Sequence, residues 1–246
     1  MCDQCSEVMP DRLAPSRRSA MLLTASALSV VFAGRALAKE TKPPPKPQNV
    51  LSPDAALKRL LEGNARYVDG VSRRHDFKHE REALASGQNP FAAVLSCADS
   101  RIAPEYAFDT GRGDLFVCRV AGNFAGTETV ASMEYAVAVL GTPLILVLGH
   151  DACGAVDATL KALKDNTSPP GHIPSLVDAI APAAKAAMQQ GGEVLDKATR
   201  QNVIDNVAKL KSAAPILSAA VEQGKLKIVG GIYRLTTGTV ELIAQG

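Results

Sequence analysis

Four apolar runs of strand length constrain the fold of this chain more than any other feature. They are FAAVLSC at 91–97, DLFVCRV at 114–120, PLILVLGH at 143–150 and LKIVGGIY at 226–233. Polar and apolar residues do not alternate in the middle of these runs, which is typical of strands buried on both faces. Because such strands occur in parallel sheets, the sequence predicts a mainly parallel central sheet.

Helical patterns separate these predicted strands. The clearest covers 127–141, and a long helical stretch fills roughly 155–222, while LTTGTVEL at 235–242 predicts a hairpin or an edge strand. Strands that alternate with helices indicate an α/β fold. We therefore expect a central sheet with strand order of about 2-1-3-4 plus an edge strand, flanked by helices.

A further helix is predicted ahead of the first strand. Ser52 is a typical N-cap and Pro53 a typical first-turn residue, and apolar residues then recur at helical spacing until about Gly70. This helix has no neighbour in the sequence to pack on. We expect an N-terminal helical arm that reaches onto a partner subunit.

The first 38 residues resemble an export signal rather than part of the fold. Arg17 and Arg18 precede an apolar run that ends in the small-x-small pattern Ala36-Leu37-Ala38, the layout of a leader of the twin-arginine type. The chain would then be exported, for example to a periplasm. An uncleaved N-terminal anchor and a plain secretory signal are the alternatives. A Pro-rich linker follows at 39–51.

Composition excludes some partners. The formal net charge is +2, and basic and acidic residues are interleaved without a basic stripe, so we expect no nucleic-acid partner. No apolar run reaches the ~18 residues needed to cross a bilayer, so we expect no stable membrane span.

Two of the predicted strands end at or near cysteine and histidine residues, which are common metal ligands. Cys97 ends the first strand, His150 ends the third, and Cys153 comes three residues later in GHDACGA. In open α/β sheets, ligands bind beyond the carboxyl ends of the strands where the strand order reverses. If strands 1 and 3 are neighbours there, these three side chains converge.

Two thiolates and an imidazole suit Zn²⁺, and three protein ligands with an open fourth position describe a catalytic site. A lone HxxC pair is nevertheless a weak signal, and a buried cysteine is often only a small hydrophobic residue. The charged pair Asp99 and Arg101 beside the strand end favours the metal site. Asp99 would take the fourth zinc position or accept a hydrogen bond from zinc-bound water, with Arg101 keeping it ionised; otherwise the pair only caps a turn.

The blocks CADSR and GHDACGA together resemble the signature of the β-class carbonic anhydrases, and the similarity extends over about 52–243. The resemblance identifies 52–246 as a β-carbonic anhydrase domain. It implies Cys97, His150 and Cys153 as ligands of one Zn²⁺ per subunit, with Asp99 and Arg101 as the catalytic pair.

The resemblance also implies substrate-binding residues and an assembly. Gln88 would orient the substrate, while Phe116 and Tyr135 would form the pocket wall, although on pattern alone both are core residues. A homodimer or tetramer is implied, with the active site near the dimer interface.

The implied reaction is the reversible hydration of carbon dioxide to bicarbonate and a proton by zinc-bound hydroxide. Hydrolysis of carbonyl sulfide or carbon disulfide at the same site is one alternative, and a non-catalytic, zinc-stabilised assembly protein is another.

Overall fold

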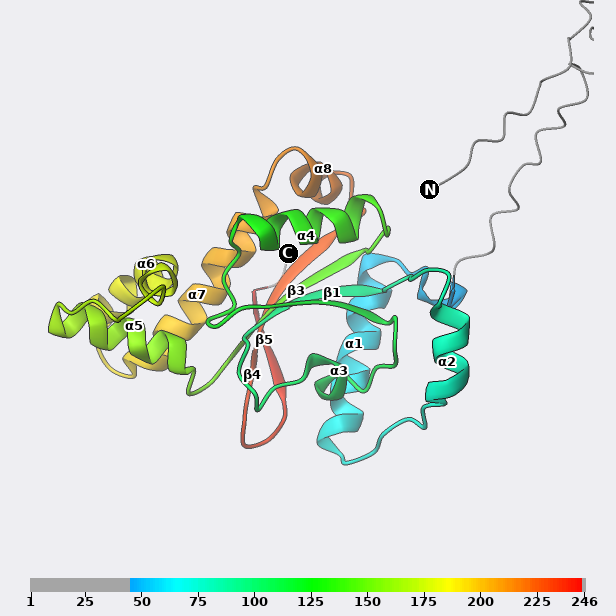
Figure 1. The fold of residues 1–246 in the computed structure, drawn as a ribbon, viewed down its shortest axis with the longest axis horizontal. Helices are drawn as coiled ribbons and strands as arrows, with labels where there is room; N and C mark the ends of the chain where they lie inside the picture. Colours follow the sequence, from blue (N-terminus) through cyan, green and yellow to red (C-terminus); the bar gives the residue numbers. More distant parts are fainter. Residues whose placement is uncertain (1–44, 245–246) are drawn as a thin grey trace, which may run out of the picture. The chain divides into compact units, whose positions relative to one another are not determined.

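Five strands form one sheet in the order β2-β1-β3-β4-β5 (Figure 1), in a computed structural model that describes residues 45–244. Strands β1 to β4 are parallel and β5 is antiparallel to β4. The strands are Leu115–Arg119 (β2), Ala92–Ser96 (β1), Leu144–His150 (β3), Lys227–Tyr233 (β4) and Val240–Ala244 (β5). The predicted strand order is confirmed, and so is the predicted hairpin or edge strand, because β5 lies at the sheet edge and forms an antiparallel hairpin with β4.

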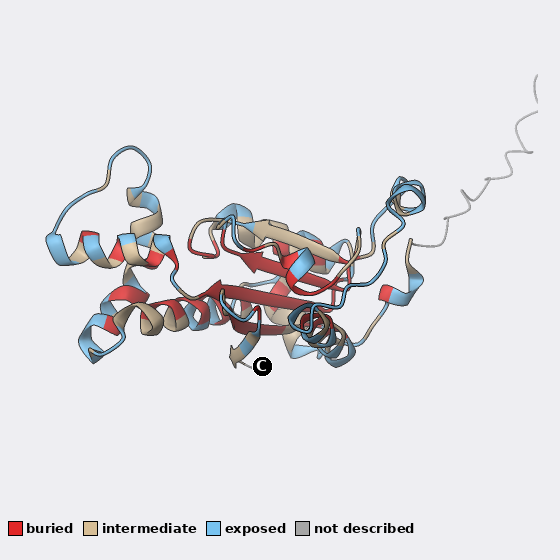
Figure 2. Cartoon of the chain, turned by 90° about the horizontal axis from the view of Figure 1, so that it is seen from below, coloured by how far each residue is buried: buried red, intermediate tan, exposed pale blue. Residues whose placement is uncertain are grey.

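The central strands β1 and β3 are apolar except for Ser96 and His150 at their carboxyl ends, because helices cover both faces of the sheet. Every residue of β1 and β3 is buried (Figure 2). Successive residues point to opposite faces, so Ala93 and Leu95 face one hydrophobic cluster while Ala92 and Val94 face another.

Helices from different parts of the chain supply the two covering layers (Figure 1). Helices α1 and α3 contact one face, and α4, α7 and α8 contact the other, while α5 and α6 pack with α7 beyond the end of the sheet. The helices are η1 (Pro47–Asn49), α1 (Pro53–Val68), α2 (Phe77–Leu84), α3 (Pro104–Ala107), α4 (Thr127–Ala138), α5 (Gly154–Asp165), α6 (Pro174–Gln190), α7 (Val194–Lys211) and α8 (Ile216–Glu222).

The N-terminal helical arm forms as its sequence predicts. The Ser52 hydroxyl accepts a hydrogen bond from the Ala55 N–H, and Pro53 occupies the first turn. Leu60, which is fully buried, anchors α1 against its own sheet. The helix thus packs within its own chain, and contact with a partner subunit stays a prediction.

The export signal at 1–38 and residues 39–44 of the predicted linker lie outside the described residues. Within residues 45–244, none of the helices combines the length and apolar character required to cross a membrane.

Candidate metal centre

Cys97, His150 and Cys153 converge at the carboxyl end of the sheet, as the predicted topology requires. Cys97 directly follows β1, His150 ends the neighbouring strand β3, and Cys153 precedes the first residue of α5. All three side chains are buried, and their ligand atoms lie within 4.8 Å of one another. The two Sγ atoms are 4.0 Å apart.

The imidazole of His150 is held so that one nitrogen faces the two sulfurs. Its Nδ1 lies 2.8 Å from the backbone oxygen of Asp151. Because a carbonyl oxygen can only accept, Nδ1 carries the hydrogen, and the Nε2 of the neutral ring has a lone pair for a metal. This Nε2 is buried and has no hydrogen-bond partner within the described part of the chain, which is the situation that a bound metal relieves.

The donor set fits Zn²⁺. Two sulfurs at the usual Zn–S distance of about 2.3 Å and a tetrahedral angle lie about 3.8 Å apart, close to the 4.0 Å between Cys97 and Cys153. Two thiolates with one imidazole are the borderline-soft ligands that zinc prefers. Three protein ligands leave one tetrahedral position for a reacting molecule.

The contact between the two thiols shifts their pKa values in opposite directions. The hydrogen bond from Cys153 lowers the pKa of Cys97 to about 4, although burial opposes this. The same hydrogen bond, together with burial, raises the pKa of Cys153. Burial by itself lowers the pKa of His150, but the nearby Cys97 sulfur, the Asp151 oxygen and the charge of Asp99 together outweigh it and raise that pKa. The environment therefore favours the thiolate form of Cys97, which is the form that binds a metal.

Asp99 reaches the same space from the loop after β1. Its Oδ2 lies 3.7 Å from Nε2 of His150. Arg101 donates from Nε to Oδ1 at 2.9 Å and from Nη2 to Oδ2 at 2.7 Å. This two-bond contact holds the pKa of Asp99 well below its usual range. The carboxylate thus stays ionised at neutral pH, at the edge of the candidate metal site.

The loop after β2, which lies outside the predicted site, supports the ligand Cys97. The backbone N–H of Gly122 donates to Sγ of Cys97 at 3.3 Å. Gly122 has φ +84°, and a Cβ there would lie 2.4 Å from Cδ1 of Ile180, so only glycine fits without rearrangement.

Two buried asparagines of α7 hold that loop in turn. Asn202 donates to the oxygen of Gly122 at 2.8 Å, and Asn206 accepts from the N–H of Ala125 at 2.7 Å. Asn206 also donates to the oxygen of Asn202 at 2.7 Å. In the sequence, the indication of this network is the spacing of Asn202 and Asn206, four residues apart, which places both on the mainly apolar face of one helix.

The predicted substrate-binding residues lie far from the metal ligands of the same chain. Gln88 precedes β1 and Cys97 follows it, and the strand between them spans about 16 Å. Phe116 pairs with Ala93 near the start of β1, and its ring centroid is 6.3 Å from that of Tyr135. One chain therefore does not bring these three residues to the cluster, and their roles stay predictions.

The other histidines and Cys118 do not join the cluster. The charged stretch RRHDFKHERE at 73–82 predicts a solvated helix face that carries His75 and His79. His79 is indeed an exposed residue of α2 that pairs with Asp76. His75 differs from that prediction, because Asp76 caps α2 and leaves His75 before the helix, beside Glu80. His172 is exposed in a turn, and Cys118 is half-buried in β2, where burial raises its pKa.

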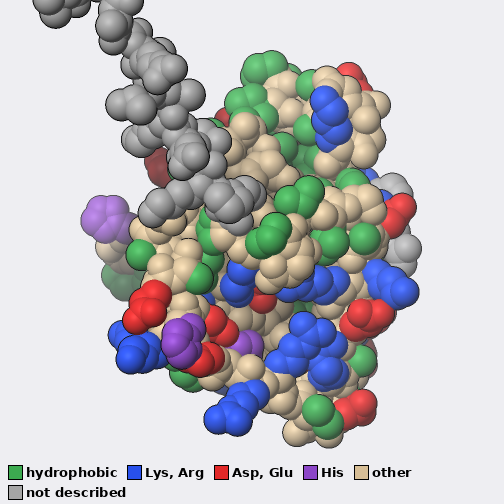
Figure 3. Space-filling view, turned by 90° about the vertical axis from the view of Figure 1, so that its right-hand side faces the viewer, with side chains coloured by type: hydrophobic (Ala, Val, Ile, Leu, Met, Phe, Trp, Pro, Cys, Tyr) green, Lys and Arg blue, Asp and Glu red, His purple; other side chains and the backbone are tan. Residues whose placement is uncertain are grey.

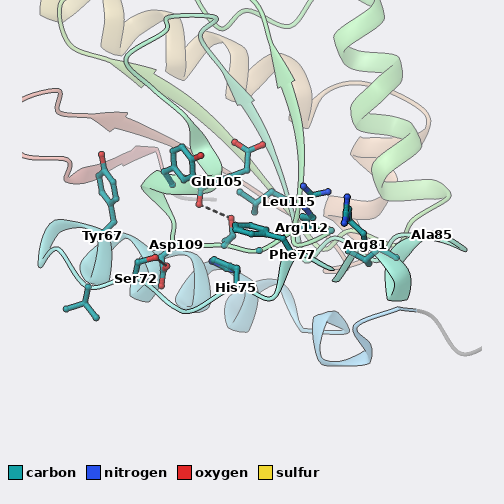
Figure 4. A pocket seen from close by; sticks show the side chains of 16 residues that line it. Tyr67, Ser72, His75, Phe77, Arg81, Ala85, Glu105, Asp109, Arg112 and Leu115 are labelled. Carbon is teal, nitrogen blue, oxygen red and sulfur yellow. Dashed lines mark hydrogen bonds between the residues drawn. The ribbon is translucent and has the colours of Figure 1, made fainter. Parts of the chain in front are cut away.

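The largest cavity described lies elsewhere, beside the start of β2. It measures about 780 Å³ and is lined from α1, α2, α3 and the loop before β2 (Figure 4). Phe77 and Tyr106 on its wall are 60% and 75% exposed. The face that carries α2 also shows basic and acidic side chains interspersed with apolar ones (Figure 3). None of the predicted site residues lines this cavity.

Comparison with known proteins agrees with this geometry. The family model described as carbonic anhydrase matches residues 92–240. "Carbonic anhydrase 2" of Mycobacterium tuberculosis is 42% identical over 192 residues, which cover 78% of this chain and 93% of that protein. The carbonic anhydrase of Pseudomonas aeruginosa is 36% identical, over 66% of this chain and 77% of that protein.

Solved structures give the same result. The β-carbonic anhydrase of Coccomyxa in complex with acetazolamide superimposes with a TM-score of 0.61 at 29% identity, covering 76% of this chain and 86% of that one. The β-carbonic anhydrase CcaA gives a TM-score of 0.60 at 27% identity, covering 78% and 93%. On the family match, the identities and the shared fold, this chain belongs to the β-carbonic anhydrase family.

Proposed function

We propose that the protein catalyses the reversible, zinc-dependent hydration of carbon dioxide to bicarbonate and a proton. The observation that carries this proposal is the buried cluster of Cys97, His150 and Cys153, with the ionised carboxylate of Asp99 at its edge. Zinc held by these three ligands would act as a Lewis acid and allow water to ionise near neutral pH.

The chain's own residues orient the reactants. Asp99 is a poor proton acceptor because Arg101 lowers its pKa, but its ionised oxygens are strong hydrogen-bond acceptors. It therefore holds the hydrogen of the attacking water and directs an oxygen lone pair toward carbon dioxide. A new C–O bond forms, bicarbonate leaves, and the released proton passes to buffer.

A second copy of the chain would complete this site. Strand β2 is an edge strand, hydrogen-bonded to β1 alone among the described strands, so its outer backbone groups can pair with another chain. Antiparallel pairing of two β2 strands about a two-fold axis places the first residues of one strand beside the last of the other. Gln88 and Phe116 of the second copy would then approach Cys97 of the first.

Exposed apolar surface beside the edge strand also favours this dimer. Tyr135 is 47% exposed and Val139 is 63% exposed. Exposed apolar side chains that lie together are typical of a surface that packs against another protein. A tetrameric β-carbonic anhydrase of Sordaria macrospora shares the fold, at a TM-score of 0.60 and 22% identity. We take the dimer as the functional unit and a tetramer as two such dimers.

The test compares two cysteine variants. Cys153→Ser removes a ligand atom, so zinc content and carbon dioxide hydration in a stopped-flow assay should both fall at least a hundred-fold. Cys118→Ser is the matched control, because Cys118 lies in β2 outside the cluster, and it should retain both. Unchanged zinc content and hydration in Cys153→Ser would contradict the proposal.

The same assay separates the alternatives. Carbonyl sulfide and carbon disulfide are offered beside carbon dioxide, and faster turnover of either sulfur compound would assign the site to it. A zinc-loaded protein that turns over none of the three would be an assembly protein.

We also propose export by the twin-arginine route, supported by the sequence around Arg17 and Arg18. A fusion of residues 1–38 to a folded reporter should reach the periplasm of a bacterial host. Changing both arginines to lysine should retain the reporter in the cytoplasm, and export of that variant at the original level would exclude the route.

A further inference from the structure

Arg119, the last residue of β2, holds the segment that carries both Cys97 and Asp99. Its Nε donates to the backbone oxygen of Cys97 at 3.0 Å, and its Nη2 donates to the backbone oxygen of Asp99 at 2.6 Å. One guanidinium thus bonds the carbonyls on both sides of Ala98. Neither the sequence motifs nor the ligand set includes this residue.

The segment needs such support because it lies beyond the end of the sheet ladder. Strand β1 ends at Ser96, and its pairing with β2 ends at Arg119. After that point the Ala98 N–H donates to the Val120 oxygen at 3.2 Å. A planar guanidinium with fixed donor directions restrains two further carbonyls at once, which a single ammonium group does not do.

The two arginines act on different parts of Asp99. Arg101 bonds both carboxylate oxygens, whereas Arg119 bonds the backbone oxygen. The first contact sets the direction of the carboxylate, and the second sets where the residue's backbone lies relative to His150 and Cys97. A displacement of about 1 Å at a reacting group can cost about a hundred-fold in rate.

We infer that Arg119 is a positioning residue, which fixes the Cys97–Asp99 segment so that the Cys97 thiolate and the Asp99 carboxylate both face the metal position. The inference rests on the proposed function for its effect on hydration, but its effect on metal binding does not require that function.

The experiment compares Arg119→Met, Arg119→Lys and the wild type. The methionine removes both hydrogen bonds and the charge while keeping an unbranched apolar stem, and the lysine keeps the charge without the two-bond fork. Arg74→Met is the matched control, since Arg74 is exposed in the loop between α1 and α2, away from the segment that carries Cys97 and Asp99. Zinc affinity is measured by competition with a chromophoric chelator, and hydration is measured against pH.

Loss of a residue that supports a metal ligand typically weakens metal binding or activity by about ten- to a hundred-fold. We expect such a fall in zinc affinity for Arg119→Met, a smaller fall for Arg119→Lys, and none for Arg74→Met. The kcat of Arg119→Met should fall more than its KM changes, and the midpoint of its kcat–pH profile should move, because the carboxylate near the metal is displaced.

Wild-type zinc affinity and a wild-type pH profile in Arg119→Met would overturn the inference. So would a variant that only dissociates into monomers while each chain keeps its zinc affinity. If Arg119→Met does not fold, the inference is tested by the zinc affinity and the pH profile of Arg119→Lys. A zinc-loaded wild type without hydration activity would contradict the proposed function, whereas the zinc affinities would still test Arg119.

Discussion

The backbone N–H of Gly122 donates to the Sγ of Cys97 across 3.3 Å, from a loop that lies 25 residues further along the chain. The bond stabilises the thiolate form of Cys97 and fixes the direction of its lone pairs. It exists because Gly122 adopts a left-handed conformation and closely approaches Ile180. The metal ligand and the loop after β2 are therefore one structural unit.

Substitution of Gly122 tests that unit. Gly122→Ala places a Cβ at φ +84° and 2.4 Å from Cδ1 of Ile180, so we expect a loss of roughly 1–3 kcal/mol in the free energy of unfolding and weaker zinc binding. Denaturant titration and chelator competition measure the two effects. Gly87→Ala, where the added Cβ would meet only Pro45 at 3.6 Å, should leave stability within about 0.5 kcal/mol. Equal stability of both variants would contradict the account.

The buried asparagine pair of α7 gives a second prediction. Asn206→Ala removes the acceptor of the Ala125 N–H and one donor to Asn202, and each unpaired buried group costs about 1–3 kcal/mol. Gln201→Ala, on the same helix but bonded only to Asp205 at an exposed site, should cost under about 0.5 kcal/mol. Chemical denaturation measures the free energy of unfolding of both variants. A similar loss for both would show that the buried asparagine network does not contribute to stability.

Asp109 gives a prediction for acid stability. Burial raises the pKa of this carboxyl, but hydrogen bonds from Arg66, Arg73 and Ser72 outweigh it and leave the pKa below its usual value. Stability from a lowered carboxyl pKa is present above the unfolded value of about 3.9 and is lost as pH falls through the folded value.

Asp109→Asn isolates this contribution, because Asp109 has φ +44° and asparagine tolerates that conformation. The variant should be less stable than the wild type by roughly 1–3 kcal/mol at pH 7. The difference should shrink as pH falls below about 3.9. Denaturant titrations of both proteins at several pH values measure it, and a difference independent of pH would contradict the ionic role.

Mixing two inactive variants tests the shared active site. Cys153→Ser lacks a metal ligand, and Gln88→Ala lacks the predicted substrate-orienting amide. If each site combines the ligands of one chain with Gln88 of the other, a mixed dimer contains one intact site. An equimolar, re-associated mixture should regain up to about a quarter of wild-type hydration. No gain over the separate variants, with mixed dimers present, would contradict the two-chain site.

The sheet and the ligand cluster could be predicted because their signals are local. The runs around Leu95 and Leu146 are apolar since both faces of β1 and β3 are covered. The carboxyl ends of adjacent parallel strands meet, so Cys97 and His150 had to approach each other once the strand order was right.

The support around the cluster could not be predicted because it depends on distant contacts. Arg119 and Asn206 have ordinary sequence surroundings, and only the packing of β2 and α7 brings them to the site. His75 was expected on a helix, but the Asp76 cap starts α2 after it. Gln88 and Cys97 lie at opposite ends of β1, so whether a second copy of the chain brings Gln88 to the cluster is not encoded in any local pattern.

Hydration activity measured against added zinc tests the central claim most directly. Metal-free protein would be titrated with Zn²⁺ while the stopped-flow hydration rate is recorded. The account predicts almost no activity without metal, a linear rise, and a break at one zinc per chain, because Cys97, His150 and Cys153 form one site. Hydration activity that does not depend on zinc, or no hydration activity at any zinc concentration, would contradict this claim.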